Sequence, residues 1–207
     1  MILAIDTSAG TSVAVVSFDG EVLALRETSD TMRHAEVVGS AIAGALADAG
    51  ILSTDVILVA GGVGPGPFTG LRVGLAAAVA FATARDIPLL PTVSHDAMAR
   101  GYYVDNGPDS FATGVRVVTD ARRKEVYWSE YSGFADGVPV RVEGPAVAKP
   151  DDLTTAPTQI VATTVSAAHL ALVALAEHAV GVSRAFDPLY LRSPDVTLSA
   201  GPKRVVQ

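Results

Sequence analysis

The chain has 207 residues, of which 49% are hydrophobic and 18% are charged, and its net charge is −7. This apolar composition excludes wholesale disorder, and the length suits one domain or two small lobes. The acidic balance argues against unaided binding to a nucleic-acid backbone, and the lack of cysteine excludes disulfides and thiolate sites.

The first half of the chain alternates between strand and helix patterns. The segments expected to form strands are 2–5, 12–18, 21–27, 56–60 and 87–91. Helical periodicity runs over 31–49 and 68–84, and Gly50 stands where a helix C-terminus favours glycine. Ser94 is predicted to be the N-cap of a third helix that ends near Tyr103.

The second half repeats the opening pattern after a linker at 105–110. The segments expected to form strands there are 114–119, 125–131, 138–142 and a weak one near Ile160, and a helix is expected at 166–180. Placing Asp6 on Asp120 superposes the two strand–turn–strand units. We therefore predict an α/β, duplicated ribonuclease-H-like fold, as in actin, sugar kinases and Hsp70 ATPase domains. Its two lobes are residues 1–107 and an abbreviated second lobe, residues 108–207.

The sequence favours a soluble, cytoplasmic protein without membrane contact. The N-terminus has no basic region before its apolar run, so it does not resemble a secretory signal. The longest stretch without formal charge, 153–176, contains Pro157, Gln159 and His169 and is too polar for a lipid-exposed span.

In this type of fold each half supplies a turn that grips phosphate, and a glycine-rich loop holds adenosine. Asp6, Thr7 and Ser8 fit the first turn, although a plain strand-end turn is an equally good interpretation of Asp6. The second turn carries Arg122, Arg123 and Lys124, which would obstruct close backbone approach. Residues 159–169 contain no glycine for an adenosine loop. The sequence therefore predicts at most a weak, vestigial phosphate site.

The glycine-rich loop at 61–74 is the most distinctive segment. It lies after a strand and before a helix, but Pro65 and Pro67 restrict its backbone and remove N–H donors. We favour a stiff loop that orients the helix over a phosphate cradle.

Histidine and serine patterns indicate neither a metal site nor a hydrolase. His34 and Glu36 have no second histidine one helical turn away, and the other histidines are scattered. There is no Gly-x-Ser-x-Gly motif. We expect no metal, and a protease would need Ser, His and Asp side chains that only the fold could bring together.

Two helices have more apolar surface than one sheet can cover. Beside their core stripes lie second stripes of small residues: Val37, Ala41 and Gly44 on the first helix, and Val73, Ala76, Ala77 and Ala80 on the second. Small residues allow close approach of other helices, so these stripes predict a protein partner.

Four segments in chain order resemble the bacterial TsaB family, also called YeaZ. They are ILAIDTS at the start, GGVGPGPFTGLRVG in the loop and helix, DARRKEVYWSEY after the linker, and DPLYLRSPDV near the end. The resemblance covers nearly the whole chain, and the second and third segments are the most specific.

The resemblance implies a non-catalytic paralogue of TsaD that forms a heterodimer with it. With the ATPase TsaE, the pair places a threonylcarbamoyl group on the adenosine beside the anticodon of tRNAs that read codons beginning with A. TsaD holds the metal, the active site and most of the tRNA, so this chain contacts tRNA indirectly. The isolated chain is expected to bind no cofactor, with ATP or ADP bound only in the complex with TsaD and TsaE.

The resemblance also places the partner interface on the two apolar helices, and implies that the isolated chain forms a homodimer through the same surface. The predicted interface residues are His34, Val37, Ala41, Gly44, Phe68, Thr69, Arg72, Val73, Ala76, Ala77 and Ala80. For Arg122, Arg123 and Lys124 we favour a solvated turn over a minor contact with tRNA.

Two alternative functions remain open from the sequence. One is a small ATP-dependent phosphotransferase that uses Asp6, and the other is a peptidase that acts on TsaD.

Overall fold

Two β-sheets form the framework of the chain in the computed structural model, which describes residues 1–30, 33–156 and 158–192. The first sheet has the strand order β3-β2-β1-β4-β5. Its strands are β1 (Ile2–Asp6), β2 (Thr11–Val16), β3 (Val22–Thr28), β4 (Leu58–Gly62) and β5 (Leu89–Thr92). The opening meander is antiparallel, whereas β4 is parallel to both β1 and β5.

The second sheet repeats this topology with one strand fewer in the described residues. Its order is β8-β7-β6-β9, with β6 antiparallel to β7 and parallel to β9. The strands are β6 (Val115–Asp120), β7 (Val126–Ala135), β8 (Val138–Ala148) and β9 (Gln159–Val161). The predicted α/β fold with an internal duplication and an abbreviated second half is therefore confirmed.

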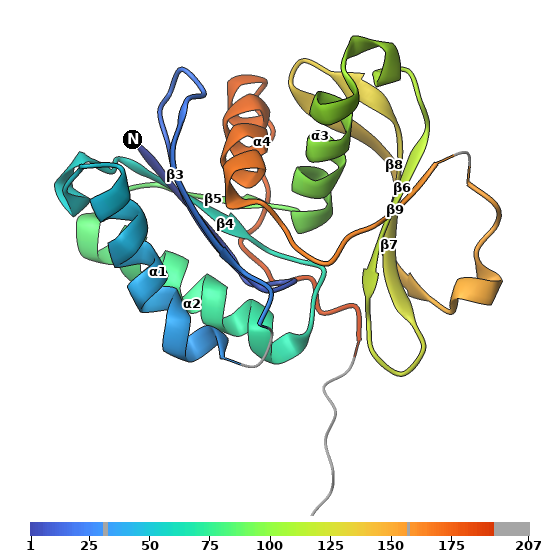
Figure 1. Cartoon of the computed structure of the whole chain (residues 1–207), viewed down its shortest axis with the longest axis horizontal. Coiled ribbons are helices and arrows are strands. Elements are labelled where there is room, and N and C mark those ends of the chain that lie inside the picture. The colour runs from blue at the N-terminus through green and yellow to red at the C-terminus, as the bar shows by residue number, and fades with distance from the viewer. Residues whose placement is uncertain (31–32, 157, 193–207) are drawn as a thin grey trace, which may run out of the picture.

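The described residues form four helices, which lie in two layers (Figure 1). They are α1 (His34–Asp48), α2 (Phe68–Arg85), α3 (Ser94–Asn106) and α4 (Ala167–Ala179), with short 3₁₀ turns at Ser53–Asp55, Pro108–Ser110 and Pro150–Asp152. Helices α1 and α2 cover the outer face of the first sheet, and α3 and α4 lie between the two sheets. The predicted helix start at Thr31 lies outside the described residues.

The two inner helices are exchanged between the halves of the chain. Helix α3 belongs to the first half of the sequence but packs on strands β6, β7 and β8 of the second sheet. Helix α4 comes from the second half and packs on β1, β2, β4 and β5 of the first sheet, beside α3. The lobe boundary at residues 107 and 108 stays a prediction from the sequence.

Strand β1 is buried on both faces, which explains its uninterrupted apolar sequence. Ile2 and Ala4 belong to the core shared with α3, α4 and the second sheet, whereas Leu3 and Ile5 pack towards α1 and α2. Because alternate side chains of a strand point to opposite faces, one apolar run serves both helix layers.

The helix ends match the sequence prediction in one case and differ in another. Gly50 follows α1 with a left-handed φ of 66°, as expected for a helix C-terminus. Ser94 is not the N-cap of α3; Val93 takes that position, and the Ser94 side chain turns towards Asp6 instead. Within the described residues, no helix has the length and apolarity needed to cross a membrane.

Candidate functional site

Asp6 stands at the end of β1, and its carboxylate is enclosed by the chain's own donors. Oδ1 accepts hydrogen bonds from the Ser8 N–H at 2.7 Å and the Ser8 hydroxyl at 2.6 Å, and Oδ2 accepts one from the Ser94 hydroxyl at 2.5 Å. The residue is 1% exposed. Ser94 lies 88 positions from Asp6 in the sequence, so no local sequence pattern predicts this hydrogen bond.

Burial controls the electrostatics of this carboxyl group. Removal from water raises the pKa of Asp6, and the hydrogen bonds from Ser8 and Ser94 partly oppose that rise because they favour the charged form. The predicted phosphate contact at Asp6, Thr7 and Ser8 stays a prediction. The geometry gives it no support at Asp6 or Thr7, since both are buried and occupied by protein partners.

The Thr7 hydroxyl ties the first turn to helix α2. It donates to the Gly70 carbonyl at 2.6 Å and accepts from the Gly74 N–H at 2.9 Å. A Cβ atom on Gly74 would lie 2.2 Å from this hydroxyl oxygen. Glycine at 74 therefore allows the helix to lie directly on the turn.

The glycine-rich loop packs against the same turn. A Cβ atom on Gly62 would lie 1.9 Å from Asp6 Oδ2, and one on Gly66 would lie 2.8 Å from Ser8 Cα. Gly66 thus allows the loop backbone to approach the turn backbone, and Gly62 leaves room for the Asp6 carboxylate. The loop thus has the role of a rigid connection that orients α2, which is the interpretation favoured from the sequence.

His34 is not an exposed interface residue, contrary to the sequence prediction. It is 6% exposed, its Nδ1 lies 2.8 Å from the Thr11 hydroxyl, and its ring lies beneath Gly70 of α2. Burial lowers the pKa of His34, which favours the neutral ring. This histidine holds the start of α1 against the first sheet.

Gly44 also serves a contact within the chain. A Cβ atom there would lie 2.5 Å from the Arg26 guanidinium carbon, because Arg26 crosses α1 to reach Asp48 at 2.6 Å. The small residue makes room for this side chain. The prediction that Gly44 faces a partner stays a prediction, and in the chain alone the Arg26 guanidinium lies over this position.

The remaining predicted interface residues divide by exposure. Those that are half-buried are Val37, Ala41, Phe68, Val73 and Ala77; those that are exposed are Thr69, Arg72, Ala76 and Ala80. The sequence analysis missed further small exposed residues on the same helices: Ala35, Gly39, Ala43, Ala47, Val79 and Ala84. We define the outer helical face as these ten exposed residues, four of them predicted from the sequence and six missed. A count of core and non-core positions around each helix would have found them.

The ten residues of the outer helical face include one charged side chain, although the first helix also exposes Glu36 and Asp48. Val79 is 41% exposed, and Arg72 is the single charged residue in the set just named. The Arg72 guanidinium stacks 3.9 Å above the Phe68 ring, and its Nε donates to the Tyr190 hydroxyl at 3.1 Å. A face built from alanine, glycine and valine suits close contact with other helices.

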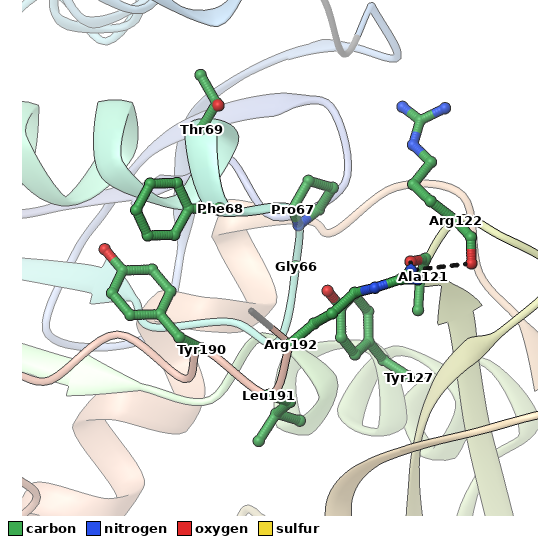
Figure 2. A pocket seen from close by; sticks show the side chains of 10 residues that line it. All are labelled: Gly66, Pro67, Phe68, Thr69, Ala121, Arg122, Tyr127, Tyr190, Leu191 and Arg192. Carbon is green, nitrogen blue, oxygen red and sulfur yellow. Dashed lines mark hydrogen bonds between the residues drawn. The ribbon is translucent and has the colours of Figure 1, made fainter. Parts of the chain in front are cut away.

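Two hollows lie where the halves of the chain meet. The smaller, of about 270 Å³, lies between the two strand-end turns and includes Ser8, Asp120 and Arg122 in its wall. The larger, of about 410 Å³, is bounded by the start of α2, the turn after β6 and residues 190–192 (Figure 2). Pro67 and Arg122 line both hollows, so the two adjoin.

His95 is sealed in the interior. It is fully buried, and its Nδ1 and Nε2 lie 2.9 Å from the Ser129 hydroxyl and 3.0 Å from the Thr119 hydroxyl. Burial, with a smaller effect of the Arg141 charge, lowers the pKa of His95 to about 3. Among the described side chains, no three of His, Asp and Glu gather closely enough to hold a metal ion.

Comparison with known proteins places the chain in a family. Residues 21–188 match the family model of TsaD, tRNA N6-adenosine threonylcarbamoyltransferase. The tRNA threonylcarbamoyladenosine biosynthesis protein TsaB of Escherichia coli is 35% identical over 150 residues, which is 72% of this chain and 63% of that protein. The chain belongs to the TsaD-like family and, within it, to the TsaB (YeaZ) group.

Two further proteins are similar over most of this chain. An uncharacterized protein of Mycobacterium leprae is 43% identical over 157 residues, which is 74% of this chain and 40% of that longer protein. The solved structure of YeaZ from Pseudomonas aeruginosa superposes with a TM-score of 0.78 at 25% identity, covering 92% of this chain and 99% of that one. The actin-like, ribonuclease-H-like fold expected for a TsaB family member is thus confirmed.

Proposed function

We propose that this TsaB-family chain is an accessory subunit in the formation of N6-threonylcarbamoyladenosine in tRNA. In this proposal it pairs with a TsaD-type transferase through the outer helical face. The observation that carries the proposal is that face, since two neighbouring helices expose small apolar side chains where a helix of an isolated protein normally presents charge. The family match supplies the pathway.

The proposal assigns catalysis to the partner. Asp6, the residue best placed for phosphate or metal chemistry, has both carboxylate oxygens engaged by Ser8 and Ser94. His95 is enclosed between two hydroxyl groups. These contacts favour a scaffold over the phosphotransferase and the peptidase, because neither side chain can reach a substrate.

The finer features of the proposal follow from membership in the TsaB group. The modified base is the adenosine beside the anticodon of tRNAs that read codons beginning with A, and TsaE is the third subunit. ATP or ADP binds only in the complex with TsaD and TsaE. Without TsaD, the outer helical face pairs two copies of this chain in a cytoplasmic homodimer.

The partner surface is tested by placing charge on it. Ala76→Glu and Ala80→Glu, singly and together, are expected to weaken binding to the TsaD of the same organism at least 10-fold, because a carboxylate would be buried without a partner. Ala135→Glu, at an exposed position on β7 of the second sheet, is the matched control. Affinity is measured by calorimetry, and melting curves establish that each variant is folded.

A folded double variant that binds TsaD with unchanged affinity would show that the outer helical face is not the interface. The pathway is tested separately, by measuring N6-threonylcarbamoyladenosine in tRNA after each subunit is left out. Full modification in the absence of this chain would refute the proposed function.

A further inference from the structure

The turn between β6 and β7 has an unusual backbone for its sequence. Arg122, Arg123 and Lys124 have φ angles of 65°, 52° and 62°, so three consecutive long side chains occupy the left-handed region. Glycine and asparagine adopt this region most readily. A turn shaped by backbone needs alone would carry those residues, so the basic side chains require a separate explanation.

The turn is held in place by a residue distant in sequence. Arg192 Nη1 donates to the Ala121 carbonyl at 2.5 Å and to the Arg122 carbonyl at 3.2 Å, and its Nη2 lies 3.1 Å from a Glu125 carboxylate oxygen. The Arg122 N–H also donates to Asp120 Oδ1 at 2.9 Å. These bonds fix the backbone. The side chains of residues 122–124 are exposed, and Arg122 Nε lies 3.8 Å from an Asp120 carboxylate oxygen.

The basic turn borders an aromatic hollow. The 410 Å³ hollow is lined by Arg122 on one side and by the rings of Phe68 and Tyr190 on the other. These rings pack with centroids 4.7 Å apart, and Tyr190 is 40% exposed. Figure 2 shows the Phe68 and Tyr190 rings together on one side, Arg192 reaching across to Ala121, and the Arg122 guanidinium pointing away from the two rings.

Exposed cations near an accessible aromatic ring are typical of single-stranded RNA contacts, since phosphates bind the cations and unstacked bases stack on the ring. Tyr190 is the accessible ring here, because Arg72 stacks on Phe68. The surrounding chain is acidic, with a net charge of −7, so the turn is a local exception. We propose that residues 122–124 and the adjoining hollow form a contact for a single-stranded segment of RNA. This inference rests on the proposed function, in which the RNA is tRNA.

The test removes charge without straining the turn. The variant Arg123→Gly with Lys124→Asn loses two cations and gains residues that favour the left-handed region, so its fold should be retained. The control Arg33→Asn with Lys149→Asn loses the same charge at exposed positions outside the hollow. A third variant, Tyr190→Leu, removes the ring and keeps an apolar side chain.

Binding is measured by fluorescence anisotropy with a labelled single-stranded RNA of 12 nucleotides, for the chain alone and with TsaD, at several salt concentrations. The turn variant should bind about 10-fold more weakly than the control, and the slope of log affinity against log salt should fall by about 1.4, since each lost phosphate contact removes about 0.7. Tyr190→Leu should weaken binding about 5- to 100-fold.

The inference is overturned if the turn variant and its control bind RNA alike, or if the wild-type chain binds no RNA in either form. Modification of tRNA distinguishes this result from failure of the proposed function. If the wild-type chain restores modification and the turn variant does so with an unchanged KM for tRNA, the inference fails while the proposed function stands. If the wild-type chain restores nothing, the proposed function itself fails.

Discussion

His95 should make the protein less stable in mild acid. Its pKa is about 3 in the folded protein and 6.5 in the unfolded chain, so the unfolded state binds more protons between these values. Stability must then fall as the pH drops below about 6.5, by about 1.4 kcal/mol per pH unit, and level off near pH 3. Between pH 7 and pH 5 the loss from this single group is about 2 kcal/mol.

The comparison with a variant isolates this contribution. Burial raises the pKa of Asp6 and of Asp96, so these carboxyl groups bind protons more readily in the folded state and oppose the effect of His95 on acidification. His95→Gln cannot be charged, and its amide can still bond to Ser129 or Thr119. Both proteins share the carboxyl contributions, which therefore cancel in the difference.

Urea unfolding at pH 7, 6 and 5 measures this difference. The wild-type advantage over His95→Gln should shrink by about 2 kcal/mol from pH 7 to pH 5. Parallel curves of unfolding free energy against pH would refute the reasoning, because they would mean that His95 titrates alike in both states. The starting difference at pH 7 does not enter the test.

Three further substitutions test contacts of α1, α2 and α3 with the first sheet and its turns. Gly74→Ala should destabilise the fold by about 1–3 kcal/mol, because its Cβ would meet the Thr7 hydroxyl, whereas Gly44→Ala should be nearly neutral, since it displaces only the end of a flexible arginine and gains helix propensity. Chemical denaturation compares the two, and equal costs would contradict this account. Ser94→Ala should cost about 1–3 kcal/mol because it leaves the buried Asp6 carboxylate without one donor. An unchanged denaturation midpoint would show that this bond contributes little.

The sequence sufficed for the elements that depend on local pattern. The strand meander, the repeat of Asp6 at Asp120 and the helical periodicity of α1 and α2 all follow from spacing and composition. The rigid role of the glycine loop also followed, because proline restricts the backbone wherever it stands.

Contacts between distant residues could not be predicted. The hydrogen bond from Ser94 to Asp6 and the position of Arg26 over Gly44 depend on how separate elements meet in space. From the sequence alone, Ser94 was therefore interpreted as a helix N-cap and Gly44 as part of a partner interface. The left-handed backbone of residues 122–124 was hidden for the same reason, since Arg192 stabilises it from 70 positions away.

Because α3 and α4 are exchanged, each half of the polypeptide supplies the helix that covers the sheet of the other half. A break in the chain at 105–110 would divide the sequence between its repeats, and it would leave each sheet on one fragment and the helix that covers it on the other. Each fragment produced there would expose an apolar face of its sheet and would carry a helix that lacks the sheet it packs on. Nicked halves should therefore stay associated, or lose their structure together, in one cooperative transition.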